Sequence, residues 1–102
     1  MRKDLTPGAK LAQSVHAAFR FADDWRYTTQ KWMDNSEYIC ILEAENEEKL
    51  NNLLEKAVQE NIPSSFFREP DFDNSLTAIA LGPCAQSKKL CSNLPLALRE
   101  SK

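Results

Sequence analysis

The spacing of apolar residues predicts a first helix over about residues 7 to 24. Its apolar side chains recur at helical intervals and form one stripe: Leu11, Val15, Ala18, Phe19 and Ala22. This spacing indicates a helix face that is buried against a core. Thr6 is a good N-cap, and Pro7 suits the first helical position because its missing N–H would have no partner there. We therefore expect the stripe to be the buried face of this helix.

A second helical pattern is the clearest in the chain. Its apolar positions follow the i, i+3, i+4, i+7, i+8 spacing of one helix face: Leu50, Leu53, Leu54, Ala57 and Val58. Asn46 is a suitable N-cap, and the two glutamates that follow it suit the positive end of the helix dipole. The helix is expected to end near Asn61, because Pro63 prevents its continuation.

Three other segments have the composition of strands. Residues 37–44, "EYICILEA", form a nearly continuous apolar run, which predicts a strand buried on both faces of a parallel sheet. Residues 64–69 and 76–83 are two further strands. The segment "PDFDNS" between them is short enough for an antiparallel hairpin. Residues 25–36 have no clean period and predict an irregular end of the first helix followed by a loop, whereas residues 85–92 predict a short last helix.

With "MRKDL" as a short first strand, the order of elements is β-α-β-α-β-β-α. A strand–helix–strand crossover makes a right-handed parallel pair, and the fourth strand returns antiparallel. The sequence thus predicts an α/β fold that forms a single domain over residues 1–102. This domain is a three-layer α/β/α arrangement, with a small mixed four-stranded sheet and helices on both faces. Ser101 and Lys102 have the character of a short tail.

Composition narrows the possible partners. The chain has 102 residues, 42% of them hydrophobic and 27% charged, as is typical of one globular domain. Its net charge of −2 gives no overall basic field, so a nucleic acid would have to bind a local basic patch. Six of the 13 basic residues do lie in the first third of the chain: Arg2, Lys3, Lys10, Arg20, Arg26 and Lys31.

The spacing of the cysteines and the start of the chain indicate where in the cell the protein is expected to be. Cys40, Cys84 and Cys91 follow no zinc-binding spacing and are expected to be reduced thiols. The opening "MRKD" has no apolar signal region, and no segment is long and apolar enough to span a membrane. These features predict a cytoplasmic protein with no membrane partner.

Candidate chemistry lies in the first helix and in the hairpin. Gly8 leaves the backbone amides at the helix start approachable, and Lys10 is close by, so this end is suited to an anion. His16 is the single histidine and serves either catalysis or packing. Glu69 and Asp71 near the hairpin turn could orient or deprotonate a water molecule, although acidic residues also favour turns for local reasons. The aromatic residues of segment 25–36 either stack on bases beside nearby basic residues or pack on the domain.

The stretch "RKDLTPGAKLAQSVHAA" resembles the signature of the type 2, archaeal and eukaryotic class, peptidyl-tRNA hydrolases. The matching residues are Arg2, Asp4, Leu5, Gly8, Ala12, Gln13, His16, Ala17 and Ala18. Near the other end of the chain, "LTAIALGPCAQS" is similar to the Thr-x-x-x-x-Gly-Pro strand and turn of that family, at Thr77, Gly82 and Pro83.

The resemblance implies hydrolysis of the ester that joins a peptide to the 3′ ribose of tRNA, with no metal or organic cofactor. It implies the catalytic residues Lys10, His16, Glu69 and Asp71, and the substrate-binding residues Arg2, Asp4, Gly8, Gln13 and Thr77. In this interpretation Gly8 and Lys10 face the tRNA backbone. The expected partners are tRNA, bound through a local basic patch, and a second copy of the chain in a homodimer.

The chain also departs from the family pattern. Lys10 stands one residue later than the lysine of the family, which is a rotation of about 100° on a helix. Glu69 occupies the position of the family's aspartate, in a shorter loop, and the apolar run before Arg2 is missing. Two interpretations follow. One is a divergent hydrolase in which Glu69 or Asp71 replaces that aspartate, which the grouping of polar residues near one helix end favours. The other is an inactive member that binds RNA, a nucleotide or a protein, which the acidic balance favours.

Overall fold

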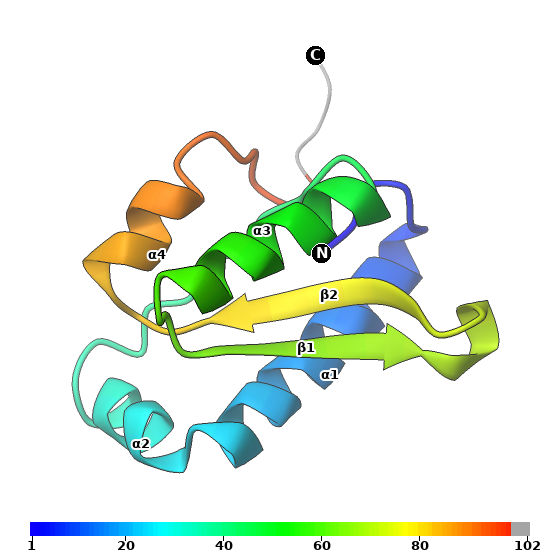
Figure 1. The fold of residues 1–102 in the computed structure, drawn as a ribbon. Helices are drawn as coiled ribbons and strands as arrows, with labels where there is room; N and C mark the ends of the chain where they lie inside the picture. The colour runs from blue at the N-terminus through cyan, green and yellow to red at the C-terminus, as the bar shows by residue number, and fades with distance from the viewer. Residues whose placement is uncertain (99–102) are drawn as a thin grey trace.

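The computed structural model describes residues 1–98, and the predicted tail at Ser101 and Lys102 lies outside this range. Figure 1 shows the order of the elements along the chain. They are α1 (Pro7–Asp24), α2 (Arg26–Asp34), α3 (Glu47–Gln59), β1 (Ser64–Glu69), the short 3-10 helix η1 (Pro70–Phe72), β2 (Ser75–Leu81) and α4 (Ala85–Leu90). None of the helices within residues 1–98 is long and apolar enough to cross a membrane.

Local signals explain where the two long helices begin. The side chain of Thr6 accepts a hydrogen bond from the amide of Ala9 at 3.3 Å, and Pro7 opens α1. Asn46 caps α3 in the same way by accepting from the amide of Lys49 at 3.0 Å. Both predicted helices and both predicted caps are confirmed.

The sheet is smaller than predicted. Within residues 1–98 it consists of β1 and β2 alone, paired antiparallel as the hairpin pattern indicated. The predicted mixed four-stranded sheet, with its parallel pair, is wrong. Residues 1–3 contact β2 and the segment 42–44 through separate hydrogen bonds, including Arg2 N to Thr77 O at 3.2 Å and Lys3 N to Ala44 O at 2.7 Å. Only isolated bridges form there, because a ladder needs several consecutive pairs.

Residues 37–44 do not form the predicted central strand. Tyr38, Ile39 and Ile41 are exposed, and only Leu42 and Ala44 take part in isolated bridges. No layer within residues 1–98 covers the first part of this segment, so its apolar side chains gain no burial from strand pairing. The prediction failed because an apolar run becomes a buried strand only if neighbouring strands and helices enclose it.

The hairpin lies between two helical layers, with α1 across one face and α3 across the other (Figure 1). On the α1 side the core contains Met1, Ala17 and Ala78. On the α3 side it contains Ala44, Leu50 and Leu76. The prediction of helices on both faces of the sheet is therefore confirmed, although the sheet itself has two strands.

The buried face of α1 is not the predicted one. Leu11, Val15 and Phe19 are 55%, 53% and 73% exposed, whereas the buried residues of α1 are Lys10, Gln13 and Ala17. Small Ala17 allows the helix to approach β2 closely, and both buried polar side chains find partners. These contacts turn the apolar stripe toward solvent.

Residues 26–34 form α2 where the sequence predicted a loop. Trp25, whose backbone is not helical, separates α1 from α2. Its indole N–H donates to the carbonyl of Ser64 at 3.0 Å, and the indole N–H of Trp32 donates to the carbonyl of Tyr38 at 2.8 Å. Each tryptophan is therefore tied to another segment by one hydrogen bond, while no residue of α2 is buried and Tyr27 is 77% exposed.

Candidate active site

A buried glutamine on α1 joins the two strands of the hairpin. Gln13 is 3% exposed, and its Nε2 donates to Glu69 Oε1 at 2.9 Å. Its Oε1 accepts a hydrogen bond from the hydroxyl of Thr77 at 2.7 Å. The two partners fix the orientation of the amide, because a hydroxyl donor lies at one end and a carboxylate acceptor at the other. We call Gln13, Glu69 and Thr77 the Gln13 cluster.

A β-bulge turns the side chain of Thr77 toward Gln13. Phe67 pairs with Ala78 and Arg68 pairs with Leu76, so Thr77 is the extra residue in β2. The bulge turns both Thr77 and Ala78 toward α1, while Leu76 faces α3. A regular strand would alternate sides and could not place two consecutive residues on one face. Thr77 is fully buried as a result.

Glu69 is the last residue of β1, and it is half-buried. Its Oε2 makes only a long contact of 3.5 Å, with the amide of Asp71, and its other oxygen is held by Gln13. The carboxylate is therefore positioned by one strong partner and remains partly open to solvent. A carboxylate held in this way is suited to accept a proton from a bound water molecule.

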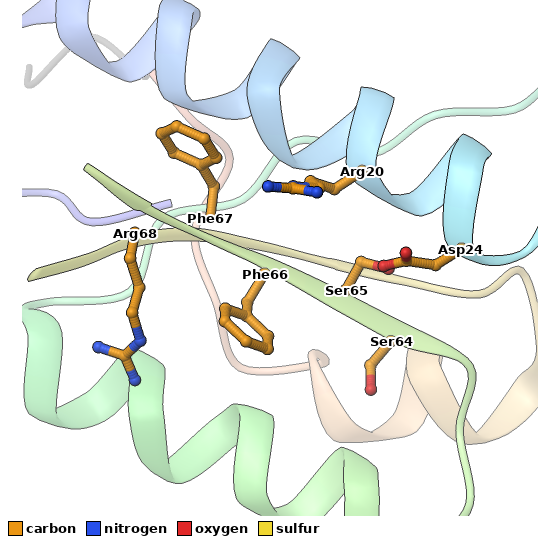
Figure 2. A pocket seen from close by; sticks show the side chains of 7 residues that line it. All are labelled: Arg20, Asp24, Ser64, Ser65, Phe66, Phe67 and Arg68. Carbon is orange, nitrogen blue, oxygen red and sulfur yellow. The ribbon is translucent and has the colours of Figure 1, made fainter. Parts of the chain in front are cut away.

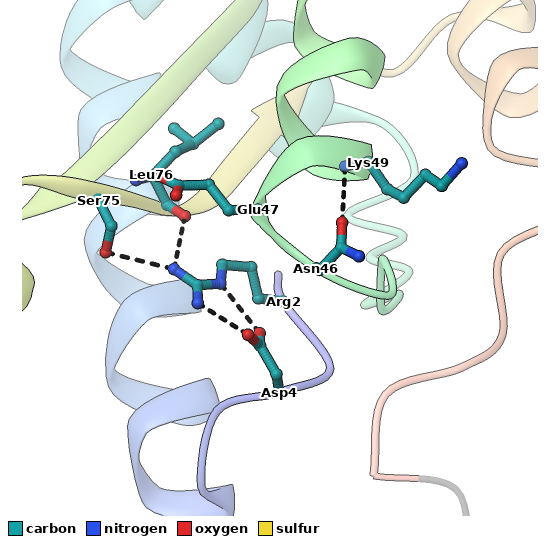
Figure 3. Close-up of polar contacts among 7 residues, drawn as sticks. All are labelled: Arg2, Asp4, Asn46, Glu47, Lys49, Ser75 and Leu76. Atoms are coloured by element: carbon teal, nitrogen blue, oxygen red, sulfur yellow. Dashed lines mark hydrogen bonds and ion pairs between the residues drawn. The ribbon is translucent and has the colours of Figure 1, made fainter.

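An ion pair lies beside Glu69 at the start of β2. Arg2 donates to Asp4 through two parallel hydrogen bonds, Nε to Oδ1 at 2.9 Å and Nη2 to Oδ2 at 2.8 Å. Figure 3 shows that Arg2 also reaches Ser75, which pairs with Glu69 across the hairpin. The hydrogen bonds from Arg2 hold the pKa of Asp4 below its usual value, and those to Asp4 raise the pKa of Arg2. The pair therefore keeps both charges at neutral pH.

Lys10 points into the protein and pairs with Glu43. Lys10 is 9% exposed and Glu43 is 6% exposed. The hydrogen bond from Lys10 lowers the pKa of Glu43. The ammonium group is thus not the exposed tRNA contact that the resemblance implied. Sequence reasoning missed Glu43, although an acidic residue inside the apolar run "ICILEA" is a signal for a buried cation nearby.

His16 lies on α1 one turn after Gln13 and stacks on Phe67. The ring centroids are 4.3 Å apart and the ring planes differ by 12°. Phe67 lies two residues before Glu69 on the same side of β1, so the exposed imidazole is next to the Gln13 cluster. The stacking fixes the ring at this position.

The structure brings together some of the predicted site residues and separates others. Gln13, Glu69 and Thr77 are in contact, with the Arg2–Asp4 pair on one side and His16 on the other. Lys10 is buried against Glu43, and Gly8 lies at the open start of α1. Asp71 adjoins the cluster through its amide, 3.5 Å from Glu69 Oε2, while the residue itself is exposed on η1.

The expected basic patch is reduced by ion pairs. Three of the early basic residues are paired with carboxylates: Arg2 with Asp4, Lys10 with Glu43 and Arg26 with Asp23. Over residues 1–98, no group of three His, Cys, Asp or Glu side chains is placed to hold a metal ion.

Comparison with known proteins gives one match that covers most of the chain. The family described as peptidyl-tRNA hydrolase PTH2 matches residues 1–96. The chain belongs to the peptidyl-tRNA hydrolase PTH2 family. A search of curated proteins finds no match. The match spans the Gln13 cluster and all other candidate residues, and it confirms the resemblance that the sequence showed.

Proposed function

We propose that this member of the peptidyl-tRNA hydrolase PTH2 family hydrolyses the ester between peptide and tRNA, with Glu69 as the general base. The observation that carries the proposal is the Glu69 carboxylate, held by the buried amide of Gln13 and partly open to solvent. Family membership supplies the substrate class. The geometry supplies a carboxylate in a defined position at the end of a strand.

The reaction needs one proton to be moved twice. Glu69 takes a proton from a water molecule as the water oxygen forms a bond with the ester carbonyl carbon. The bond between that carbon and the 3′-oxygen of the ribose then breaks, and the proton passes to this oxygen. The products are a tRNA with a free 3′-hydroxyl and a peptide with a free carboxylic acid, which releases its proton to water and becomes a carboxylate.

The residues around Glu69 take different roles in this proposal. Gln13 and Thr77 are positioning residues, since Thr77 orients Gln13 and Gln13 holds the carboxylate. His16 lies beside the cluster, where its imidazole can donate a hydrogen bond to the ribose or to the developing oxyanion. Arg2, held by Asp4, lies on the opposite side and, as one half of an ion pair, offers the tRNA backbone a hydrogen-bond donor rather than a net charge.

Lys10, Gly8 and Asp71 take other roles in this proposal. Lys10 holds α1 in place through its ion pair with Glu43 and does not contact the substrate. The amides at Gly8 lie at the positive end of the α1 dipole and offer a place for a phosphate of the bound tRNA. Asp71 lies beyond Glu69 in the turn and is the alternative base.

The two carboxylates can be separated by matched substitutions. We expect Glu69→Gln to lower kcat by about 100-fold or more for release of N-acetylalanine from N-acetylalanyl-tRNA, because the amide cannot accept the proton. Asp71→Asn is the control and should retain most of the activity. Circular dichroism should show both variants folded, since the amide oxygen that Glu69→Gln introduces can still accept the hydrogen bond from Gln13.

Other outcomes identify other functions. Loss of turnover in Asp71→Asn alone would make Asp71 the base. A folded wild-type protein that binds tRNA without releasing the amino acid would contradict hydrolysis and indicate a binding module.

A further inference from the structure

A groove runs along the outer edge of β1. Its cavity of about 290 Å³ is lined by Arg20 and Asp24 of α1 and by residues 64–68 of β1. Figure 2 shows Arg20 on the α1 side of the strand and Arg68 on the α3 side, so the groove follows the strand edge between two guanidinium groups. The groove is therefore lined by consecutive residues of β1 and by two residues of α1, with a guanidinium group on each side of the strand.

The backbone of β1 presents hydrogen-bonding groups to this groove. The carbonyl of Ser64 points away from β2, since it accepts from the indole of Trp25. Backbone groups of alternate residues in an antiparallel strand point the same way, so those of Phe66 and Arg68 also face outward. The carbonyl of Phe67 points toward β2, where it contacts the Thr77 hydroxyl, in agreement with this alternation.

A strand edge whose main-chain groups are left open to solvent is unusual in proteins. Natural edge strands are commonly blocked by proline, by a bulge or by a covering segment. In β1 the bulge lies on the partner strand, and Trp25 covers only the Ser64 end. The uncovered part, from Phe66 to Arg68, leads directly to Glu69. The open edge and the proposed catalytic carboxylate are therefore continuous.

We propose that the peptide part of peptidyl-tRNA binds along this edge as an added β-strand. The inference rests on the proposed function, which places the ester carbonyl at Glu69. The amide backbone is the one feature that peptides of every sequence share. Pairing with an exposed strand edge recognises that backbone through main-chain hydrogen bonds and needs no particular side chain.

The position of the ester sets the direction of the bound peptide. The C-terminal residue of the peptide carries the ester and lies near Glu69, and earlier residues extend toward Ser64. Both chains then run in the same direction, so the added strand is parallel to β1. In a parallel pair one peptide residue can bond the carbonyl of Phe66 and the amide of Arg68, and the residue two places before it can bond the amide of Phe66. The two flanking arginines add donors for peptide carbonyls.

A single strand of RNA is the competing occupant. Arg68 lies 5.7 Å from the ring centroid of Phe66, and such a pair resembles a platform for base stacking. However, the carboxylate of Asp24 also lines the groove, where it accepts from the hydroxyl of Ser65 at 2.7 Å. The carboxylate offsets part of the positive charge of Arg20 and Arg68 that would attract phosphodiesters. The outward main-chain groups of Phe66 and Arg68 pair with an amide backbone, which RNA does not have, so the groove favours the peptide.

Substrates of different peptide length test the proposal with the wild-type protein. We expect the KM for N-acetyl-tetraalanyl-tRNA to be about tenfold lower than that for N-acetylalanyl-tRNA, as two backbone hydrogen bonds would produce. N-methylation of successive peptide amides should raise KM in alternation, by about five- to tenfold at amides that face β1 and little at those between. This alternation is specific to strand pairing.

A pair of substitutions tests the same edge from the side of the protein. Phe66→Pro removes the outward amide without removing a bond to β2, and proline is tolerated at such edge positions. It should reduce the advantage of the longer substrate, because one of the main-chain bonds to the peptide is lost. Phe66→Ala keeps the amide and should preserve both the length advantage and the alternation. Circular dichroism checks that both variants are folded.

The outcomes separate this proposal from the proposed function. Hydrolysis of both substrates with equal KM and no alternation overturns strand pairing while peptidyl-tRNA hydrolysis stands. If Phe66→Pro weakens the binding of uncharged tRNA as much as it weakens the binding of the longer substrate, the groove binds RNA. That outcome also overturns strand pairing. If neither substrate is hydrolysed by folded wild-type protein, the proposed function fails and strand pairing fails with it.

Discussion

Lys10 and Glu43 place two opposite charges in contact inside the protein. Moving each charge out of water is costly, and their mutual attraction offsets that cost only while both are present and ionised. The pKa of Glu43 is lowered by the hydrogen bond from Lys10, which means that the folded state favours the ionised carboxylate. Protonation of this one residue should therefore weaken the fold.

This pair predicts a loss of stability in acid. The folded-state pKa of Glu43 is below the unfolded value of about 4.3, so its contribution is complete above that value. It is lost as the pH falls through the lower pKa of the folded state. We expect the free energy of unfolding, measured with urea from pH 7 to pH 3, to fall less steeply in Glu43→Gln than in the wild type. An identical slope would contradict the role of the pair.

At the scale of elements, α1 shows that the amphipathic pattern of a helix does not by itself decide which face is buried. Its apolar stripe of Leu11, Val15 and Phe19 faces solvent, and its packed face carries Gln13 and Ala17. Gln13 binds both strands of the hairpin, and Ala17 packs against Ala78. Hydrogen bonds and close packing with β2 thus decide which face of the helix is buried.

Substitutions on the two faces of α1 should differ in their cost. Val15→Lys replaces an exposed side chain and should change the free energy of unfolding by less than about 0.5 kcal/mol. Ala17→Leu forces a larger side chain against Ala78 and should destabilise the protein by about 1–3 kcal/mol. Urea denaturation measures both. A large loss in Val15→Lys would show that the stripe is packed in solution.

At the scale of the whole molecule, the hairpin connects two small cores. Ala17 and Ala78 pack on the α1 side, and Leu50 and Leu76 pack on the α3 side. Leu76 and Ala78 of β2 belong to different cores, so neither core can open without disturbing the strand that they share. The domain should therefore unfold as one unit.

Leu50→Ala tests this coupling. Leu50 is 1% exposed, and its truncation should cost about 2–5 kcal/mol. Far-ultraviolet circular dichroism and tryptophan fluorescence should report the same midpoint, although the tryptophans lie near α2 and far along the chain from Leu50. Two separate midpoints would show that the cores unfold independently.

Much of the candidate site could be predicted from the sequence, and its geometry could not. Gln13 and Thr77 match the family signature, and Glu69 stands at the hairpin turn in the position of the family's aspartate. Their contact depends on the bulge at Thr77, which no local pattern marks. Lys10 was selected as well, but its role changed because its partner Glu43 lies 33 residues away along the chain.

The sequence by itself determined α1, α3, the hairpin and family membership. Caps, helical periodicity and turn residues act over a few neighbouring positions, so a short window of sequence contains the whole signal. The tertiary structure alone decided which face of α1 is buried, that residues 37–44 form no strand, and that Lys10 is paired inside. Each of these depends on contacts between distant segments, whose burial and hydrogen bonding outweigh local preference.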